Sequence, residues 1–218
     1  MTEPAHLAAV RESYDTVAAD YVRLVVPPER MDPLSRAMLA AFAELVRESG
    51  GGEVADLGCG PGRVTAYLSG LGLSAFGVDV SGEMVALARR AYPRLRFLHG
   101  SMAALDLPGG GLGGILAWYS VHHTPVGQLP SLFAEFHRVL APGGHLLLGG
   151  HVGEPQLLRP AQAYGHPVSY ASHLVPAARL AELLEAAGFT VTTRMEQPHP
   201  QRAYRSYACL LACASDRC

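Results

Sequence analysis

Three alternate glycines, Gly58, Gly60 and Gly62, follow Asp56 at the end of a short apolar run. Glycine at such a turn lets the backbone approach a ligand that a side chain would exclude, and a helix that starts directly after the turn offers free N–H groups. A tight strand-to-helix connection that binds nothing would look the same. The glycines therefore predict a ligand loop only if a second element supports them.

That second element is Asp79, which lies 21 residues after Gly58 at the end of the next apolar run. In nucleotide-binding folds a carboxylate at this point accepts hydrogen bonds from the two ribose hydroxyls. Its alternative role would be to cap the following helix, but Ser81 already fills that position. Loop and carboxylate together predict that the protein binds a nucleoside.

The charges around the loop indicate which nucleoside it is. Arg63 occupies the position that is small in the dinucleotide fingerprint GxGxxG/A. Asp56 would repel a pyrophosphate and attract a cationic amine. S-adenosylmethionine has no phosphate and carries an amino group and a sulfonium, so these charges favour it over NAD. An NAD(P)-linked oxidoreductase and a non-catalytic cofactor-binding protein remain the alternatives.

Two adjacent histidines, His122 and His123, follow an apolar run that ends in Ala117, Trp118 and Tyr119. In a doubly wound sheet, ligands bind at the carboxyl ends of the strands, so this segment should border the transferred group. Imidazole is the side chain best suited to remove a proton near neutral pH. The segment therefore predicts a general base, with simple packing as the alternative role of either histidine.

Nearly the whole chain, from residues 14–21 (YDTVAADY) to the last strands, resembles the class I S-adenosylmethionine-dependent methyltransferases that act on small molecules. The resemblance implies that Asp56 and the loop of Gly58, Cys59 and Gly60 bind the methionine part of the cofactor. It also implies that Asp79 binds the ribose and that S-adenosylhomocysteine is released as a product. Family members often carry Tyr-Ser-x-x-His-x-x-Pro near the fourth strand, which favours His123 over His122 as the base.

Further cofactor contacts follow from the same resemblance. Val80 and Met84 would flank the adenine. Many members have Gly-Asp after the third strand, where this chain has Gly100, Ser101 and Met102, so the adenine amino group would meet a hydroxyl or nothing. The remaining positions expected at the cofactor are Tyr14 and Tyr21 in an N-terminal helix, and Ala117, Trp118 and Tyr119 after the fourth strand.

The elements that position these residues alternate in type. Short apolar runs at 53–57, 74–79, 95–99, 113–119 and 145–150 predict strands, and amphipathic stretches at 62–69, 81–91, 126–140 and 176–187 predict helices. This rhythm predicts an α/β, Rossmann-like fold with a doubly wound, mostly parallel sheet covered on both faces. The runs at 189–195 and 204–214 lie too close for a parallel crossover and predict an antiparallel hairpin.

The family resemblance gives this seven-stranded sheet the order 3-2-1-4-5-7-6, with strand 7 antiparallel. We expect a single domain over residues 1–218, in which residues 1–50 form a helical cap. Residues 151–174, rich in Gly, Pro and His, would be an insertion over the active-site edge.

Composition excludes several classes of protein. The 218 residues carry a net charge of −2, with no lysine, which argues against a nucleic-acid partner and excludes lysine Schiff-base chemistry. The apolar runs are too short for a membrane span, and the N-terminal residues show no export signal. Four cysteines without a CxxC pair predict reduced thiols, no metal site and a cytoplasmic location. The remaining expectation is an enzyme that methylates an oxygen or nitrogen of a small-molecule acceptor.

Overall fold

The computed structural model describes residues 3–200, 202 and 204–214. The helices are α1 (Ala5–Leu24), α2 (Pro33–Glu48), α3 (Arg63–Gly70), α4 (Gly82–Ala91), α5 (Leu129–Val139) and α6 (Ala177–Ala186), and the 3₁₀ turns are η1 (Pro28–Arg30), η2 (Val121–His123) and η3 (Val126–Gln128). The strands of the main sheet are β1 (Glu53–Leu57), β2 (Ser74–Asp79), β3 (Arg96–His99), β4 (Leu112–Trp118), β5 (Leu140–Val152), β10 (Phe189–Pro198) and β11 (Ser206–Ala214).

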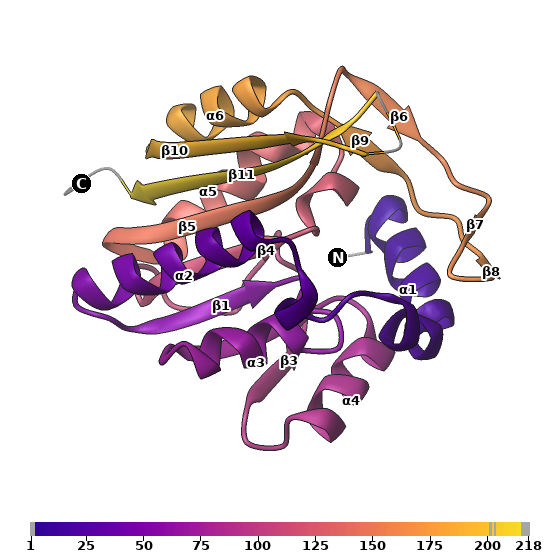
Figure 1. Ribbon diagram of the computed structural model, residues 1–218, viewed down its shortest axis with the longest axis horizontal. Coiled ribbons are helices and arrows are strands. Elements are labelled where there is room, and N and C mark those ends of the chain that lie inside the picture. Colours follow the sequence, from indigo (N-terminus) through magenta and orange to yellow (C-terminus); the bar gives the residue numbers. More distant parts are fainter. Residues whose placement is uncertain (1–2, 201, 203, 215–218) are drawn as a thin grey trace.

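These seven strands form one sheet in the order β10-β11-β5-β4-β1-β2-β3 (Figure 1). β1 to β5 pair in parallel, whereas β11 runs antiparallel to both β5 and β10. The predicted order 3-2-1-4-5-7-6 and the terminal hairpin are therefore confirmed.

Alternate residues of the central strands pack on opposite faces of the sheet. Leu146 and Leu148 of β5 face the core formed with α5 and α6, while Leu147 faces the core formed with α2 and α3. Both faces are thus buried, which explains why the strands are continuous apolar runs rather than alternating ones. Within the described residues, no helix combines the length and apolar content that crossing a membrane requires.

The fifth strand is longer than expected. It begins at Leu140, directly after α5, and continues to Val152, instead of spanning only 145–150. The pairing with β4 skips from Leu112 opposite Leu140 to Gly114 opposite His145, so Pro142 and its neighbours lie in an irregular part of the ladder. A Pro-Gly-Gly sequence is typical of a loop, and residues 142–144 indeed have no paired residue on β4 or β11, while Leu140 and His145 on either side of them pair with β4.

Two segments lie over the carboxyl ends of the strands. α1 is one, and the other is the segment between β5 and α6, which contains the small ladders β6 (Gln156–Leu158) with β9 (Ser172–Leu174) and β7 (Gln162–Ala163) with β8 (His166–Pro167) (Figure 1). α2, by contrast, packs against the sheet face through Leu39, Phe42 and Val46. The region expected to be a helical cap therefore divides into α1 over the site and α2 in the core.

Two buried cysteines, Cys59 and Cys209, carry free thiols. Cys213 in β11 is disulfide-bonded, so the prediction of reduced thiols throughout is wrong at that residue.

Candidate functional site

A cavity of about 550 Å³ lies at the carboxyl ends of the parallel strands, under α1. This volume is in the range of small-molecule sites. Most of the residues predicted at the cofactor line it: Tyr14, Tyr21, Gly58, Gly60, Asp79, Val80, Met84, Gly100, Ser101, Met102, Trp118, Tyr119 and His123. The fold thus brings residues from five separate segments of the chain to one place.

Four predicted residues do not line this cavity. Asp56 and Ala117 are buried in their strands, and Cys59 packs with Val85 and Phe97. His122 lines a separate, smaller cavity. The cofactor contacts of Asp56, Cys59 and Ala117 and the role of His122 as a base therefore stay predictions that the cavity lining does not support.

Each glycine of the loop is required for a different structural reason. Gly60 has φ +52° and no atom within 4 Å of an added Cβ, so its position faces open space. At Gly62 an added Cβ would lie 2.6 Å from the Phe97 ring, and at Gly58 it would lie 2.3 Å from Cβ of Ser120. Gly58 therefore lets Ser120, at the end of β4, pack against the loop, and Gly62 lets β3 and α4 pack against it. Gly60 forms the bare backbone at the cavity.

Asp79 holds the loop in place. Its Oδ2 accepts a hydrogen bond of 2.7 Å from the Gly60 N–H, and its Oδ1 accepts one of 2.8 Å from the Ser81 N–H. The side chain is 9% exposed and lines the cavity, and burial raises its pKa. Ser81 caps α4, as expected, by accepting from the Met84 N–H at 3.1 Å. The Asp79 carboxylate is thus positioned on two sides and presented to the cavity.

Asp56 points to the other face of its strand. Residues one apart on a strand face opposite sides, so Asp56 shares the side of Val54, where α3 covers it. The Thr65 hydroxyl donates to Asp56 Oδ2 at 2.6 Å. Burial raises the pKa of Asp56 to about 7. In this structure the Asp56 carboxylate faces α3 rather than the cavity.

His123 is held by two hydrogen bonds. Its Nδ1 lies 2.9 Å from the Ala171 carbonyl oxygen, and its Nε2 lies 3.0 Å from the Tyr14 hydroxyl. Burial lowers the pKa of His123 to about 4, so the ring is neutral at pH 7. A carbonyl oxygen only accepts, so Nδ1 carries the proton, and the Tyr14 hydroxyl donates to Nε2. Burial also raises the pKa of Tyr14 well above its usual value, which keeps this donor protonated.

The segment between β5 and α6 closes against α1. The Tyr14 and Tyr170 rings stack with centroids 5.7 Å apart, and Tyr21 meets Tyr164 edge-on at 5.0 Å. The two sides of the closure also hydrogen-bond through Ser169 N to Ser13 Oγ at 3.0 Å and through His166 Nε2 and Asp20 Oδ2, 2.5 Å apart.

α1 is also tied to the sheet side of the site. The Ser81 hydroxyl donates to Asp15 Oδ1 at 2.6 Å, and the Arg63 guanidinium donates to the carbonyls of Val22 and Val25. Arg63, whose size argued against a dinucleotide, therefore anchors the end of α1.

Sequence reasoning missed several residues of the site. The Ser120 hydroxyl joins the ends of β4 and β1 by donating to the Leu57 carbonyl at 2.7 Å. Tyr170 and Ala171 complete the surroundings of His123. Further lining residues come from the start of α1 and its N-cap and from the start of α5 and the residue before it: Pro4, His6, Leu7, Val10, Gln128 and Ser131. Helical amphipathicity was the only signal for the residues in α1, and it does not distinguish a cavity wall from a core.

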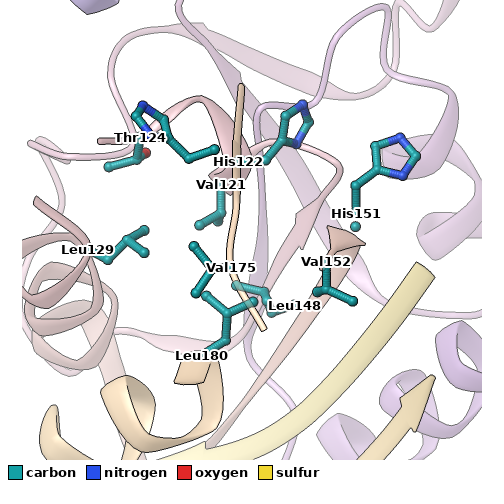
Figure 2. Close-up of a pocket in the computed structure, with 11 residues that line it drawn as sticks. Val121, His122, Thr124, Leu129, Leu148, His151, Val152, Val175 and Leu180 are labelled. Carbon is teal, nitrogen blue, oxygen red and sulfur yellow. The ribbon is translucent and has the colours of Figure 1, made fainter. Parts of the chain in front are cut away.

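His122 lies beside a second cavity of about 30 Å³ between η2, β5, β9 and α6 (Figure 2). Its ring centroid is 4.1 Å from that of His123 and 6.0 Å from that of His151. Most of the other residues around it are aliphatic, including Leu148 and Val175. Among the residues that the structure describes, no three His, Cys, Asp or Glu side chains are grouped as metal ligands would be.

Comparison with known protein families shows a match over the core of this site. The family model described as a methyltransferase domain matches residues 54–144, which include the glycine loop, Asp79 and the two histidines.

Relatives of known sequence cover more of the chain. A probable S-adenosylmethionine-dependent methyltransferase of Mycolicibacterium smegmatis is 29% identical over 151 residues, 69% of this chain. The chain spans only 56% of the length of that protein. An uncharacterized methyltransferase of Synechocystis is 30% identical over 149 residues, which cover 67% of this chain and 70% of the relative.

Among solved structures, the 1,6-didemethyltoxoflavin-N1-methyltransferase of Burkholderia thailandensis is similar over nearly the whole chain. The TM-score is 0.71 at 26% identity, with 99% of this chain and 93% of that chain covered. That structure contains 1,6-didemethyltoxoflavin and S-adenosylhomocysteine. The shared region includes α1 and the segment over the site as well as the sheet.

Proposed function

Because this chain belongs to the class I S-adenosylmethionine-dependent methyltransferases, we propose that it transfers a methyl group from S-adenosylmethionine to an oxygen or nitrogen of a small-molecule acceptor. One observation carries the proposal. A single cavity is bordered by the bare backbone of Gly60 and the Asp79 carboxylate, and also by the hydrogen-bonded pair of His123 and Tyr14.

The cavity wall fits this cofactor. Gly60 leaves space where any side chain would project, and Asp79 presents a carboxylate for the ribose hydroxyls. Val80 and Met84 offer apolar surface for the adenine, and the Ser101 hydroxyl stands where other members carry an acid. When bound, S-adenosylmethionine supplies a methyl group activated by its sulfonium sulfur and leaves as S-adenosylhomocysteine. We therefore assign Gly58, Gly60, Asp79, Val80 and Met84 to cofactor binding.

The residues of the chain then have to orient the acceptor and remove its proton. Orientation in line with the methyl group contributes up to about 7–11 kcal/mol in favourable cases. We assign the proton to His123, whose Nε2 carries the lone pair that accepts the hydrogen bond from Tyr14. The Tyr14 hydroxyl donates to this nitrogen, and Tyr14 also lines the cavity, so it can relay a proton from the acceptor. The acceptor proton passes to the Tyr14 oxygen as the Tyr14 proton passes to Nε2, so charge ends on His123.

The low pKa of His123 does not prevent this role. Burial disfavours the imidazolium, but as the sulfonium loses its positive charge the acceptor proton brings one positive charge to the same cavity. The net charge of the buried site is therefore unchanged across the reaction. A base of this kind contributes about 10²–10⁴-fold to the rate when the acceptor is a hydroxyl or a protonated amine.

The test has two parts. Calorimetry with S-adenosylhomocysteine and with NADH measures which cofactor binds; the proposal expects heat with the first and none with the second. Transfer of labelled methyl from S-adenosylmethionine to a panel of phenols, alcohols and amines then measures catalysis. Binding of S-adenosylhomocysteine without transfer to any acceptor would instead support a non-catalytic binding protein, and binding of NADH alone would support an oxidoreductase.

A further inference from the structure

Buried polar nitrogens without hydrogen-bond partners gather at one point beside the main cavity. Within the described residues there are four such side-chain atoms: Trp118 Nε1, His122 Nδ1, His151 Nδ1 and Arg205 Nε. The last three belong to neighbouring groups. The His122 and His151 ring centroids are 6.0 Å apart, and Nη2 of Arg205 lies 3.3 Å from Nε2 of His199, whose ring centroid is 6.5 Å from that of His151. Figure 2 shows the two imidazoles on the same side of the aliphatic residues that line the small cavity. A buried polar group normally has a partner, so this cluster calls for one.

The imidazole and guanidinium groups close to the cluster are all basic. His122 is faced by His123, His151, Arg205 and His173, and every one of them lowers its pKa. His151 is faced by Arg205, His199 and Arg202 with the same sign. Among the described residues, no carboxylate forms a hydrogen bond or an ion pair with either ring. Imidazole N–H and guanidinium N–H groups without an acidic partner form a binding site for an anion.

The cluster adjoins the space in which the acceptor must lie. The His122 ring rests 4.1 Å from the ring of His123, and the Tyr119 ring, which lines the main cavity, meets His151 edge-on at 5.0 Å. Four aromatic rings line the main cavity, those of Tyr14, Tyr21, Trp118 and Tyr119. Such a wall favours a flat, apolar ligand body. Two residues of the cavity wall, Tyr119 and His123, therefore lie directly against the two imidazoles of the cluster.

We propose that His122, His151 and Arg205 form a subsite for a carboxylate on the methyl acceptor, so that the acceptor is an aromatic acid. This proposal rests on the proposed function, since it names the substrate class of the same site. The carboxylate accepts hydrogen bonds from the three orphaned nitrogens and neutralises the cluster. Its negative charge also favours protonation of the two imidazoles, so binding takes up protons from solution.

The experiment uses the full chain saturated with S-adenosylhomocysteine and compares benzoate with its neutral analogue benzamide by calorimetry. We expect benzoate to bind about tenfold more tightly or better, as charge-assisted hydrogen bonds predict. Titration in two buffers of different ionisation enthalpy should reveal proton uptake with benzoate only. Equal affinity for benzamide, or no binding of benzoate up to its solubility limit, would overturn the proposal.

Variants locate the preference. His122→Phe keeps the ring shape and removes the nitrogens, and Arg205→Gln removes the charge; each should reduce the preference for benzoate to about twofold or less. Arg194→Gln is the matched control, since Arg194 lies on β10 with a half-exposed side chain beside Glu196. A preference that survives in both variants would place the carboxylate elsewhere and refute the assignment.

Sodium acetate distinguishes a free anion from an acceptor group. If acetate binds as tightly as benzoate, the cluster takes small anions and the assignment to the acceptor is wrong. Heat from S-adenosylhomocysteine, recorded first on every variant, separates this outcome from failure of the proposed function. A protein that binds S-adenosylhomocysteine but shows no benzoate preference keeps the methyltransferase proposal and loses only the subsite.

Discussion

The backbone N–H of Gly60 donates a hydrogen bond of 2.7 Å to Oδ2 of Asp79. This bond joins the two elements that the sequence singled out independently, a glycine loop after β1 and a carboxylate at the end of β2. Because Asp79 also accepts from the Ser81 N–H, its carboxylate cannot rotate without losing a backbone partner. The loop and the acid therefore act as one preorganised unit of the cavity wall.

Replacement of Gly60 by alanine tests the bare backbone. Gly60 has φ +52° and open space around an added Cβ, so Gly60→Ala should fold, with a loss of about 1 kcal/mol from backbone strain. The new methyl group projects into the cavity and should weaken the binding of S-adenosylhomocysteine at least tenfold, as measured by calorimetry.

Gly110→Ala is the control for that strain. Gly110 has φ +69° and equally open surroundings, but it lies in the loop before β4, outside the cavity lining. Gly110→Ala should lose a similar amount of stability in thermal unfolding and keep the affinity for S-adenosylhomocysteine. Equal affinities for the two alanine variants would contradict a cofactor at Gly60.

The Asp79 carboxylate should be essential for the cofactor. Asp79→Asn turns one acceptor oxygen into an NH₂ group that faces the N–H of Gly60 or Ser81, and it removes the charge available to a ribose. We expect S-adenosylhomocysteine to bind at least tenfold more weakly, about 1.4 kcal/mol. Asp106→Asn, at an exposed position, provides the comparison and should bind like the unmodified protein. Unchanged calorimetry of Asp79→Asn would remove the carboxylate from the cofactor site.

His123 should make the fold sensitive to acid. Its pKa is about 4 in the folded protein and 6.5 when unperturbed, so the unfolded chain binds more protons between these values. Stability from this residue is complete above about pH 6.5 and is lost as the pH falls toward 4. At about pH 5 the loss is about 2 kcal/mol, and His123→Gln should lack that part of it. Guanidinium unfolding at about pH 7.5 and pH 5 measures the difference.

The same variant separates a base from a packing residue. With an acceptor from the labelled-methyl panel that must lose a proton, His123→Gln should reduce kcat by about 10²–10⁴-fold while S-adenosylhomocysteine binds as before. A kcat close to that of the unmodified protein, with the cofactor bound, would leave His123 only its structural role.

Asp56 should change the pH dependence of stability in the direction opposite to that of His123. Burial raises its pKa from 3.8 to about 7, so the folded protein binds more protons between these values and stability falls as the pH rises through them. Asp56→Asn keeps an acceptor for Thr65 and removes the buried charge. The unfolding free energy of the unmodified protein should drop from about pH 5 to pH 8 by roughly 2–3 kcal/mol more than that of the variant. Parallel profiles would mean that Asp56 is ionised normally.

The order of the helices and strands could be predicted from local sequence. The buried strands are continuous apolar runs, Ser81 caps α4 as expected, and the short spacing before β11 requires an antiparallel return. These features depend only on residues that are close in sequence, so the sequence of this chain is enough to predict them. Strand β5 departs from prediction because its added residues are held by distant strands rather than by their own preference.

Tertiary structure decided which of the two histidines, His122 or His123, and which of the two carboxylates, Asp56 or Asp79, faces the main cavity. Successive residues of a 3₁₀ turn point about 120° apart, so η2 sends His123 to the main cavity and His122 to the smaller one. Asp56 lies inside its strand and faces α3, whereas Asp79 ends its strand and reaches the cavity. The partner of His123 at Ala171 is 48 residues away in sequence. No local pattern encodes such a contact, because it exists only once α1 and the segment before α6 have closed over the sheet.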